Sequence, residues 1–192
     1  MKRLILVVAI LCAGFANAQQ GPETGGHEIE FWTGGGHSVP GGTASTGVWN
    51  AGLRYGWILT QPHGPGILSG RFEYAVDAVP VFLVFQPANT PYGGGVNPVN
   101  LKWGFATRGK VAPYLEISGG TLFTTRNVPT GTSQINFTSG AALGTHLLGS
   151  RHAFSVEVRY MHISNAGLAT PNPGINTVQV RFGVGKFFGA KP

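Results

Sequence analysis

About eight segments of this chain alternate apolar residues with polar or small ones, and this alternation constrains the fold more than any other feature of the sequence. In residues 47–59, for example, Trp49 and Leu53 fall on one face and Asn50 and Arg54 on the other. A period of two is typical of a β-strand with one apolar face. The expected strands are residues 27–34, 47–59, 70–85, 97–107, 111–125, 133–148, 152–165 and 176–188.

The composition favours a membrane location for these strands. Charged residues make up only 10% of the chain, whereas soluble domains contain roughly 25%. Aromatic residues contribute 11%, and 31 residues are glycine. Beyond the first 18 residues, no stretch approaches the ~20 apolar residues of a membrane helix. Together these features predict an all-β fold, an eight-stranded antiparallel transmembrane β-barrel.

The first residues predict export. Two basic residues precede the apolar run 4–15, and residues 16–18 have the small-x-small pattern of a signal-peptide cleavage site. We therefore expect a signal peptide over residues 1–18 and an outer-membrane β-barrel domain over residues 19–192. Cleavage would remove Cys12, the one cysteine of the sequence, so the mature chain would form no disulfide.

The connections between the expected strands differ in length. Shorter ones are expected near residues 60–69, 108–110 and 149–151, and longer, Gly/Pro/Asn-rich ones near residues 35–46, 86–96, 126–132 and 166–175. Outer-membrane barrels have short periplasmic turns and long extracellular loops, so both termini should be periplasmic. Two glycine tracts, residues 34–36 and 93–95, are expected in loops, and neither is followed by a helix that would make a phosphate site.

Alternation places most of the charged residues inside the barrel. Because ions buried without partners cost several kcal/mol each, we expect these charges to pair into a packed ionic network instead of lining an open pore. The expected inward acids are Glu28, Glu30, Glu73, Asp77, Glu116 and Glu157, and the expected inward bases are Arg54, Arg71, Lys102, Arg159 and Arg181.

His162 and Ser164 stand two residues apart at the end of the seventh expected strand. Alternation places both on the outer, lipid-facing side, next to Tyr160. An imidazole beside a hydroxyl is the minimal arrangement for nucleophilic hydrolysis. Since odd-numbered strands run outward, the pair should face the outer leaflet, which is lipopolysaccharide in Gram-negative bacteria.

The stretch from His162 to Leu168, with the Pro-Asn-Pro-Gly-Ile sequence of residues 171–175, resembles the outer-membrane lipid A 3-O-deacylases (PagL type), also known as acyloxyacyl hydrolases. The resemblance covers about the last quarter of the chain well, with a weaker echo in residues 134–144. It implies an eight-stranded barrel that removes an ester-linked acyl chain from lipid A through a Ser-His-Glu triad. By this resemblance Ser164 is the nucleophile and His162 its general base.

The resemblance also implies the remaining members of the site. Asn165, with the backbone N–H groups of Ala166 and Gly167, would line the oxyanion hole. The family's glutamate falls at Asn176, which has the outward parity of Val178. An amide can orient an imidazole, but it lacks the charge that stabilises an imidazolium. No other carboxylate is expected to substitute, because all except that of Glu23 point inward.

Three kinds of function remain open from the sequence. The first is a lipid A esterase in the outer membrane, and the second is a catalytically weak or inactive barrel with a structural or envelope-interaction role. The third is a secreted soluble barrel for an apolar ligand, which would need an apolar interior. The esterase needs no cofactor, and a homodimer is possible.

The remaining residues have structural interpretations. Without Lys2 and Arg3 of the expected signal peptide, 11 of the 13 basic residues remain against 7 acidic ones, and this net charge of +4 suits an anionic membrane surface. No nucleic-acid motif is visible. The histidines show no metal-ligand spacing and are expected at the surface or rim: His27, His37, His63, His146 and His152. Several aromatic residues are expected to form an interfacial girdle or lipid-facing packing: Trp49, Tyr55, Trp57, Trp103 and Tyr160.

Overall fold

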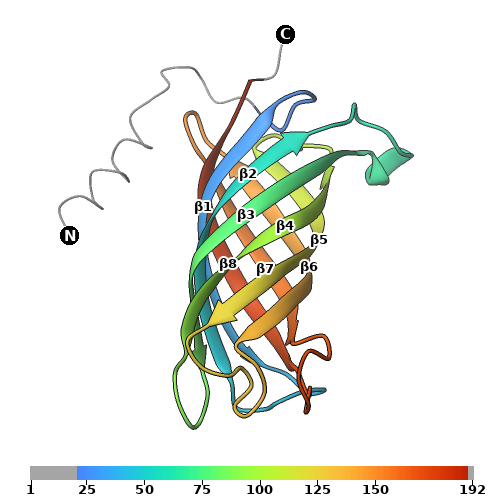
Figure 1. Cartoon of the computed structure of the whole chain (residues 1–192). Coiled ribbons are helices and arrows are strands. Elements are labelled where there is room, and N and C mark those ends of the chain that lie inside the picture. Colours follow the sequence, from blue (N-terminus) through green and yellow to red (C-terminus); the bar gives the residue numbers. More distant parts are fainter. Residues whose placement is uncertain (1–20, 190–192) are drawn as a thin grey trace, which may run out of the picture.

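The structure, a computed structural model, describes residues 21–189. Eight antiparallel strands close into one barrel in sequence order, with β1 paired to β8 (Figure 1). The strands are β1 (His27–Ser38), β2 (Gly47–Ile58), β3 (Gly70–Phe85), β4 (Tyr92–Phe105), β5 (Val111–Thr124), β6 (Ile135–Leu148), β7 (Ala153–Ser164) and β8 (Ile175–Phe188). The predicted fold class is confirmed. The predicted signal peptide, residues 1–18, lies outside the described residues.

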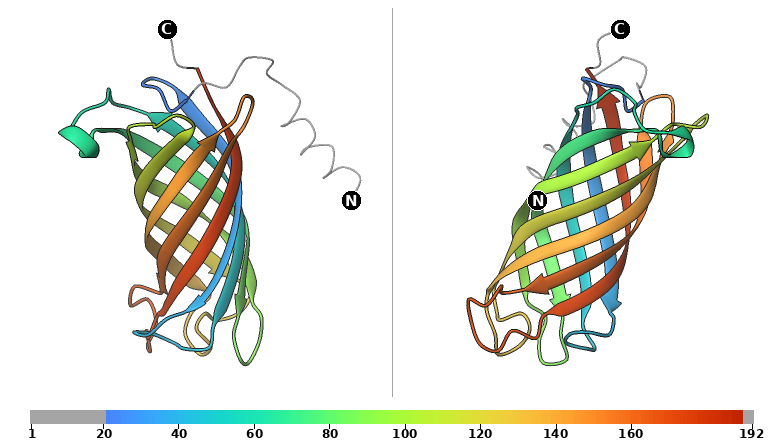
Figure 2. Two further views of the ribbon diagram at one scale, coloured as in Figure 1. Left: turned by 180° about the vertical axis from the view of Figure 1, so that it is seen from behind. Right: turned by 90° about the vertical axis from the view of Figure 1, so that its right-hand side faces the viewer.

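The two ends of the barrel differ in their connections. The first and last described residues lie at one end, together with the turns 106–110 and 149–152 and the longer turn 59–69 (Figures 1 and 2). We call this the terminus end. The opposite, loop end carries the connections 39–46, 86–91, 125–134 and 165–174. No helix of the described residues is long and apolar enough to cross a membrane.

The expected alternation is present in the wall, with apolar residues outward and charged residues inward. Along β8, for example, Val178 and Val180 are 43% and 41% exposed, whereas Gln179 and Arg181 are buried. The pairing of β3 with β4 shifts between Val79 and Phe82, and this bulge turns Phe82 inward. A one-residue shift exchanges the faces of a strand, which strict alternation from the sequence cannot anticipate.

Arg54 is the centre of the ionic network in the barrel interior. Its guanidinium donates to both oxygens of Asp77, at 2.8 and 3.0 Å, and to both oxygens of Glu116, at 2.6 and 2.9 Å. Arg159 joins Glu116 at 2.5 Å to Glu157 at 2.8 Å. All five side chains are buried, so the pairing that desolvation demands is achieved.

A second group of charges lies nearer the terminus end. Lys102 Nζ donates to Glu28 at 2.6 Å and to Glu73 at 3.1 Å, and His146 Nε2 lies 3.4 Å from Glu28. His146 is therefore inside the barrel, and its expected place at the surface or rim is wrong. Its position on β6 has inward parity, and its ring packs against Tyr114 and Phe187.

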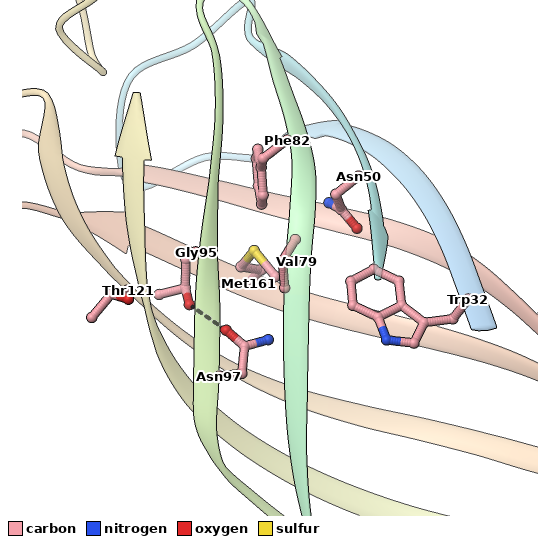
Figure 3. Close-up of a pocket in the computed structure, with 9 residues that line it drawn as sticks. Trp32, Asn50, Val79, Phe82, Gly95, Asn97, Thr121 and Met161 are labelled. Carbon is pink, nitrogen blue, oxygen red and sulfur yellow. Dashed lines mark hydrogen bonds between the residues drawn. The ribbon is translucent and has the colours of Figure 1, made fainter. Parts of the chain in front are cut away.

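Apolar side chains close the interior on both sides of the charges. At the loop end the buried cluster contains Trp32, Val48, Val79, Phe82, Val84, Leu122, Val128, Met161, Ile163 and Ile175. At the terminus end Ile58, Ala153 and Phe187 form a smaller cluster. A small cavity near Trp32 and Met161 is bordered by Asn50 and Asn97 (Figure 3). A secreted soluble barrel for an apolar ligand would need an apolar interior throughout. The buried charges between the two apolar clusters do not fit that function.

Both glycine tracts lie in strands, β1 and β4, and the prediction that they lie in loops is wrong. The reason is a close approach between neighbouring strands. A Cβ on Gly93 would collide with the carbonyl oxygen of Phe123, and one on Gly36 with that of Val178. Glycine is therefore required by tertiary crowding in the wall, although in the sequence it is typical of a loop.

Candidate active site

The candidate site lies on the outer wall at the loop end, where β7 ends and β8 begins. In β7 the side chains of Met161 and Ile163 point into the apolar interior, with 6% and 0% exposure. Alternation therefore turns His162 and Ser164 outward, as predicted, and both are half-buried. The outward position of this polar pair follows from the apolar residues beside it, which fix the register of the strand.

Asn176 lies directly opposite His162 in the pairing of β7 with β8. The imidazole Nδ1–H donates to Asn176 Oδ1 at 2.6 Å. In a neutral imidazole, this bond selects the tautomer whose lone pair lies on Nε2, which is the form a general base requires. An amide in this position can orient an imidazole as a triad acid does, but it carries no charge.

Ser164 lies at the last position of β7, opposite Phe137 of β6. Within residues 21–189 no hydrogen bond joins its hydroxyl to His162. The two residues are neighbours on one face of one strand, about 7 Å apart along it. A serine hydroxyl swings about a single side-chain torsion, and catalytic hydrogen bonds often tighten only when substrate is bound.

The loop 165–174 is held by the side chains of two asparagines. Asn172 Oδ1 accepts the backbone N–H of Asn165 at 3.1 Å. Asn165 Oδ1 accepts the N–H of Gly167 at 2.9 Å, and its Nδ2 donates to Ala169 O at 3.1 Å. Asn165 is 1% exposed, so its side-chain amide is buried and holds the loop through these hydrogen bonds.

Ala166 is the residue between these fastened groups. Its φ is +51°, in the left-handed region that non-glycine residues seldom occupy. Among the hydrogen bonds of the described chain, its backbone N–H has no acceptor, whereas those of Asn165 and Gly167 do. Of the three predicted oxyanion donors, Ala166 is thus the one that offers a free backbone N–H beside Ser164.

The loop 39–46 covers Asn176 from the other side. Val39 N–H donates to Asn176 O at 2.8 Å, and Thr43 N–H donates to Gly174 O at 2.9 Å. Asn176 is consequently 7% exposed although its parity is outward. At Gly174, where φ is +66°, a Cβ would lie 2.8 Å from His162 Cε1, so only glycine allows the loop to pack on the imidazole. No local pattern in residues 39–46 predicts this contact.

Beside the site, the outer wall presents apolar surface. Phe137, Tyr160 and Val178 are 40%, 44% and 43% exposed and flank the His162–Asn176 pair in the strand register. The wall toward the terminus end is equally apolar, with Val158 and Val180 exposed. An acyl chain lying along the barrel would meet hydrocarbon next to Ser164.

The charged clusters of the described residues lie away from this site. Glu28, Glu30 and His146 are close enough together to share an ion, but Lys102 already neutralises Glu28. All three side chains are buried inside the barrel, whereas His162 and Ser164 face outward. The chemistry available at the candidate site is therefore that of the hydroxyl, the imidazole and the amides.

The fold defines the class of the protein, a β-barrel of the Gram-negative outer membrane. The crystal structure of the outer membrane enzyme PagL superposes with a TM-score of 0.62 at 20% identity, covering 80% of this chain and 97% of that one. The crystal structure of the outer membrane protein OprG from Pseudomonas aeruginosa has a TM-score of 0.57 at 14% identity, and the match covers 90% of this chain and 100% of that one. The crystal structure of Neisserial surface protein A has a TM-score of 0.55 at 15% identity, and the match covers 86% of this chain and 98% of that one.

The sequence profile of the lipid A 3-O-deacylase (PagL) family matches residues 49–185. The chain belongs to this family, as the resemblance around His162 and Ser164 predicted. No curated protein matches the sequence significantly.

Replacing Asn172 with alanine is expected to lower kcat of the esterase reaction proposed below about fivefold, while KM is unchanged and the barrel still folds. The substitution removes the acceptor that fastens the start of the loop at Asn165, and one such bond contributes about 1 kcal/mol. Asn127→Ala is the matched control, because Asn127 makes a similar side-chain bond to Thr132 O in the loop 125–134. Equal kcat values for the two variants in deacylation assays would contradict the positioning role.

Proposed function

We propose that the protein is an outer-membrane esterase that removes an ester-linked acyl chain from lipid A. The observation that carries the proposal is the 2.6 Å bond from His162 to Asn176, beside Ser164, on the outer wall of a barrel that belongs to the lipid A 3-O-deacylase family. The loop end, where these residues lie, would be extracellular. Its wall would be in contact with the lipopolysaccharide leaflet.

In the proposed reaction Ser164 Oγ attacks the ester carbonyl and its proton passes to His162 Nε2. The resulting oxyanion would accept a hydrogen bond from Ala166 N–H, while Asn165 and Gly167 hold the loop. Collapse breaks the bond to the sugar oxygen, which takes the proton from His162. Water, deprotonated by the same imidazole, then attacks the acyl-enzyme carbonyl. The bond to Ser164 Oγ breaks, Oγ takes the proton back from His162, and the fatty acid is released.

The substrate would reach the site within the membrane. The exposed side chains of Phe137, Tyr160 and Val178 provide an apolar surface for the acyl chain beside the nucleophile. The ester of lipid A lies near the boundary between acyl chains and sugar, and Ser164 lies at the end of β7 where the wall meets its loop. No cofactor takes part in these steps.

Mass spectrometry of lipid A tests the proposal directly. In a host that makes fully acylated lipid A, expression of the wild-type barrel is expected to remove one hydroxyacyl chain, and Ser164→Ala is expected to remove none. Ser139→Ala is the control, since Ser139 is an exposed outward serine of β6 opposite His162. Unmodified lipid A with correctly inserted wild type would contradict the esterase.

A catalytically inactive barrel with a structural or envelope-interaction role is the second candidate. Asn176 favours it, because the imidazole has no carboxylate partner among the described residues and the inward acids are sealed in the lumen. Under this alternative wild type and Ser164→Ala leave lipid A equally intact. The signal peptide over 1–18, the barrel domain over 19–192, the possible homodimer and the lack of a nucleic-acid partner stay predictions.

A further inference from the structure

The outer surface of the described chain is strongly basic because almost all of its acids are inside the barrel. Of the seven acidic residues, six are buried in the lumen and Glu23 is exposed. Four basic residues are buried with them. The other described ones lie on the outer face or at the rims: Arg71, Arg108, Lys110, Arg126, Arg151 and Lys186. Arg71, expected inward with the network, keeps the parity of Glu73 but is only half-buried, at the mouth of the barrel. Outside the lumen, the described residues therefore carry six basic groups against one acidic group.

These basic residues are concentrated at one end. All except Arg126 lie at the terminus end, on the turns or within a few residues of them. Arg108 and Lys110 lie in the turn between β4 and β5, and Arg151 lies in the turn between β6 and β7. The two turns adjoin each other, since Leu148 N–H donates to Lys110 O at 2.8 Å. Three exposed cations thus share one short arc of rim.

Next to this basic rim, the wall carries a band of aromatic rings. Tyr55 and Trp57 lie 4.8 Å apart, and Trp57 stacks on Tyr74 at 5.7 Å between ring centroids. Trp103 contacts His63 edge-on at 4.7 Å. Tryptophan and tyrosine gather where a membrane meets water, so the band marks the depth of the lipid headgroups at this end.

The turn 59–69 adds an apolar element beside the cations. Its short helix, Gly66–Leu68, exposes Ile67 by 79% and Leu68 by 56%, and the turn projects sideways from the barrel (Figure 1). Trp103 Nε1–H donates to Leu68 O at 3.2 Å and ties the turn to the aromatic band. Apolar side chains that project at headgroup depth, among cations, are suited to a lipid surface rather than to a soluble anion.

We propose that the terminus-end rim, with Arg108, Lys110 and Arg151 as its core, binds anionic phospholipid headgroups of the periplasmic leaflet. Clustered basic residues at a membrane surface bind acidic phospholipids through charge, and each residue adds to the affinity. The rim offers three such residues on adjoining turns. The proposal depends on the terminus end facing the periplasm, and it is independent of the esterase activity.

The test is native mass spectrometry of the purified full chain, released from nanodiscs of phosphatidylcholine with a minor fraction of phosphatidylglycerol. Wild type is expected to retain phosphatidylglycerol preferentially. In the triple variant R108Q/K110Q/R151Q this preference is expected to fall at least about tenfold. R126Q, which removes an exposed arginine at the loop end, is the matched control and should behave as wild type.

Two results would overturn the proposal. One is equal retention of phosphatidylglycerol by wild type and the triple variant, with both shown to be folded by their heat-modifiable electrophoretic mobility. The other is a preference for added lipid A over phosphatidylglycerol that depends on the same three residues, which would place this end in the outer leaflet. Neither result depends on cleavage of lipid A, so failure of the esterase proposal remains distinguishable.

Discussion

Replacing Asn176 with aspartate is expected to raise the rate of lipid A deacylation by up to about 10⁴-fold. In serine proteases the opposite change, from the triad aspartate to asparagine, lowers kcat by about 10⁴, and this sets the scale of the effect. Aspartate has the shape of asparagine, so its carboxylate would take the 2.6 Å position of Asn176 Oδ1 on His162 Nδ1. The new charge would stabilise the imidazolium that forms when Ser164 loses its proton.

Release of fatty acid from purified lipid A in detergent, followed by mass spectrometry, measures this effect. Asn176→Glu supplies the same charge but is one methylene longer, and Asn176 lies close against Gly41 of the loop 39–46. We therefore expect a smaller gain from glutamate than from aspartate. Ser164→Ala in the Asn176→Asp background should abolish the gain. An unchanged rate in Asn176→Asp would show that the transition state gains nothing from a charge at this position.

Replacing Arg54 with methionine is expected to destabilise the barrel by about 3–5 kcal/mol. Methionine keeps much of the volume, but it removes four hydrogen bonds and leaves Asp77 and Glu116 without their main partner. Removing one member of a buried ion pair costs this much because the remaining charge is still desolvated. The free energy of unfolding in urea, from tryptophan fluorescence in lipid vesicles, measures the loss.

Arg126→Met is the matched control, because it removes an exposed arginine and should change the free energy of unfolding by less than about 0.5 kcal/mol. Adding Asp77→Asn to Arg54→Met should restore part of the lost stability, since it also removes a buried charge. If Arg54→Met and Arg126→Met unfold at the same urea concentration, the buried network is not what holds the interior together.

Alternation in the sequence predicts the inward face of most charged residues of the wall. Asp77, Glu116 and Arg159 were placed in the lumen by counting positions from their apolar neighbours, and the structure confirms each. The prediction works because a barrel wall has one apolar and one polar face, so alternation has a single solution. Strict alternation does not hold at Phe82, where a bulge interrupts the pairing of β3 with β4, because bulges depend on the partner strand.

The candidate site could be predicted only in part. The resemblance to the family placed Asn176 beside His162, and the outward parity of both residues agrees with the bond that the structure shows. The fastening of the loop by Asn165 and Asn172 is not visible in the sequence, since it depends on which amide reaches which backbone group after the chain has turned. The loop 39–46, which lies far earlier in the chain, packs over Asn176. No local pattern in its sequence predicts this contact.

The placement of His162 and Ser164 on the outside of the wall has a kinetic consequence. A substrate that stays in its leaflet meets the site by lateral diffusion, so the encounter rate depends on its mole fraction among the surrounding lipids and not on its bulk concentration. Diluting lipid A with inert lipid at constant total substrate should therefore slow the proposed reaction. In the proposed reaction, substrate and site would meet within the bilayer, while the barrel interior would only hold the wall in shape.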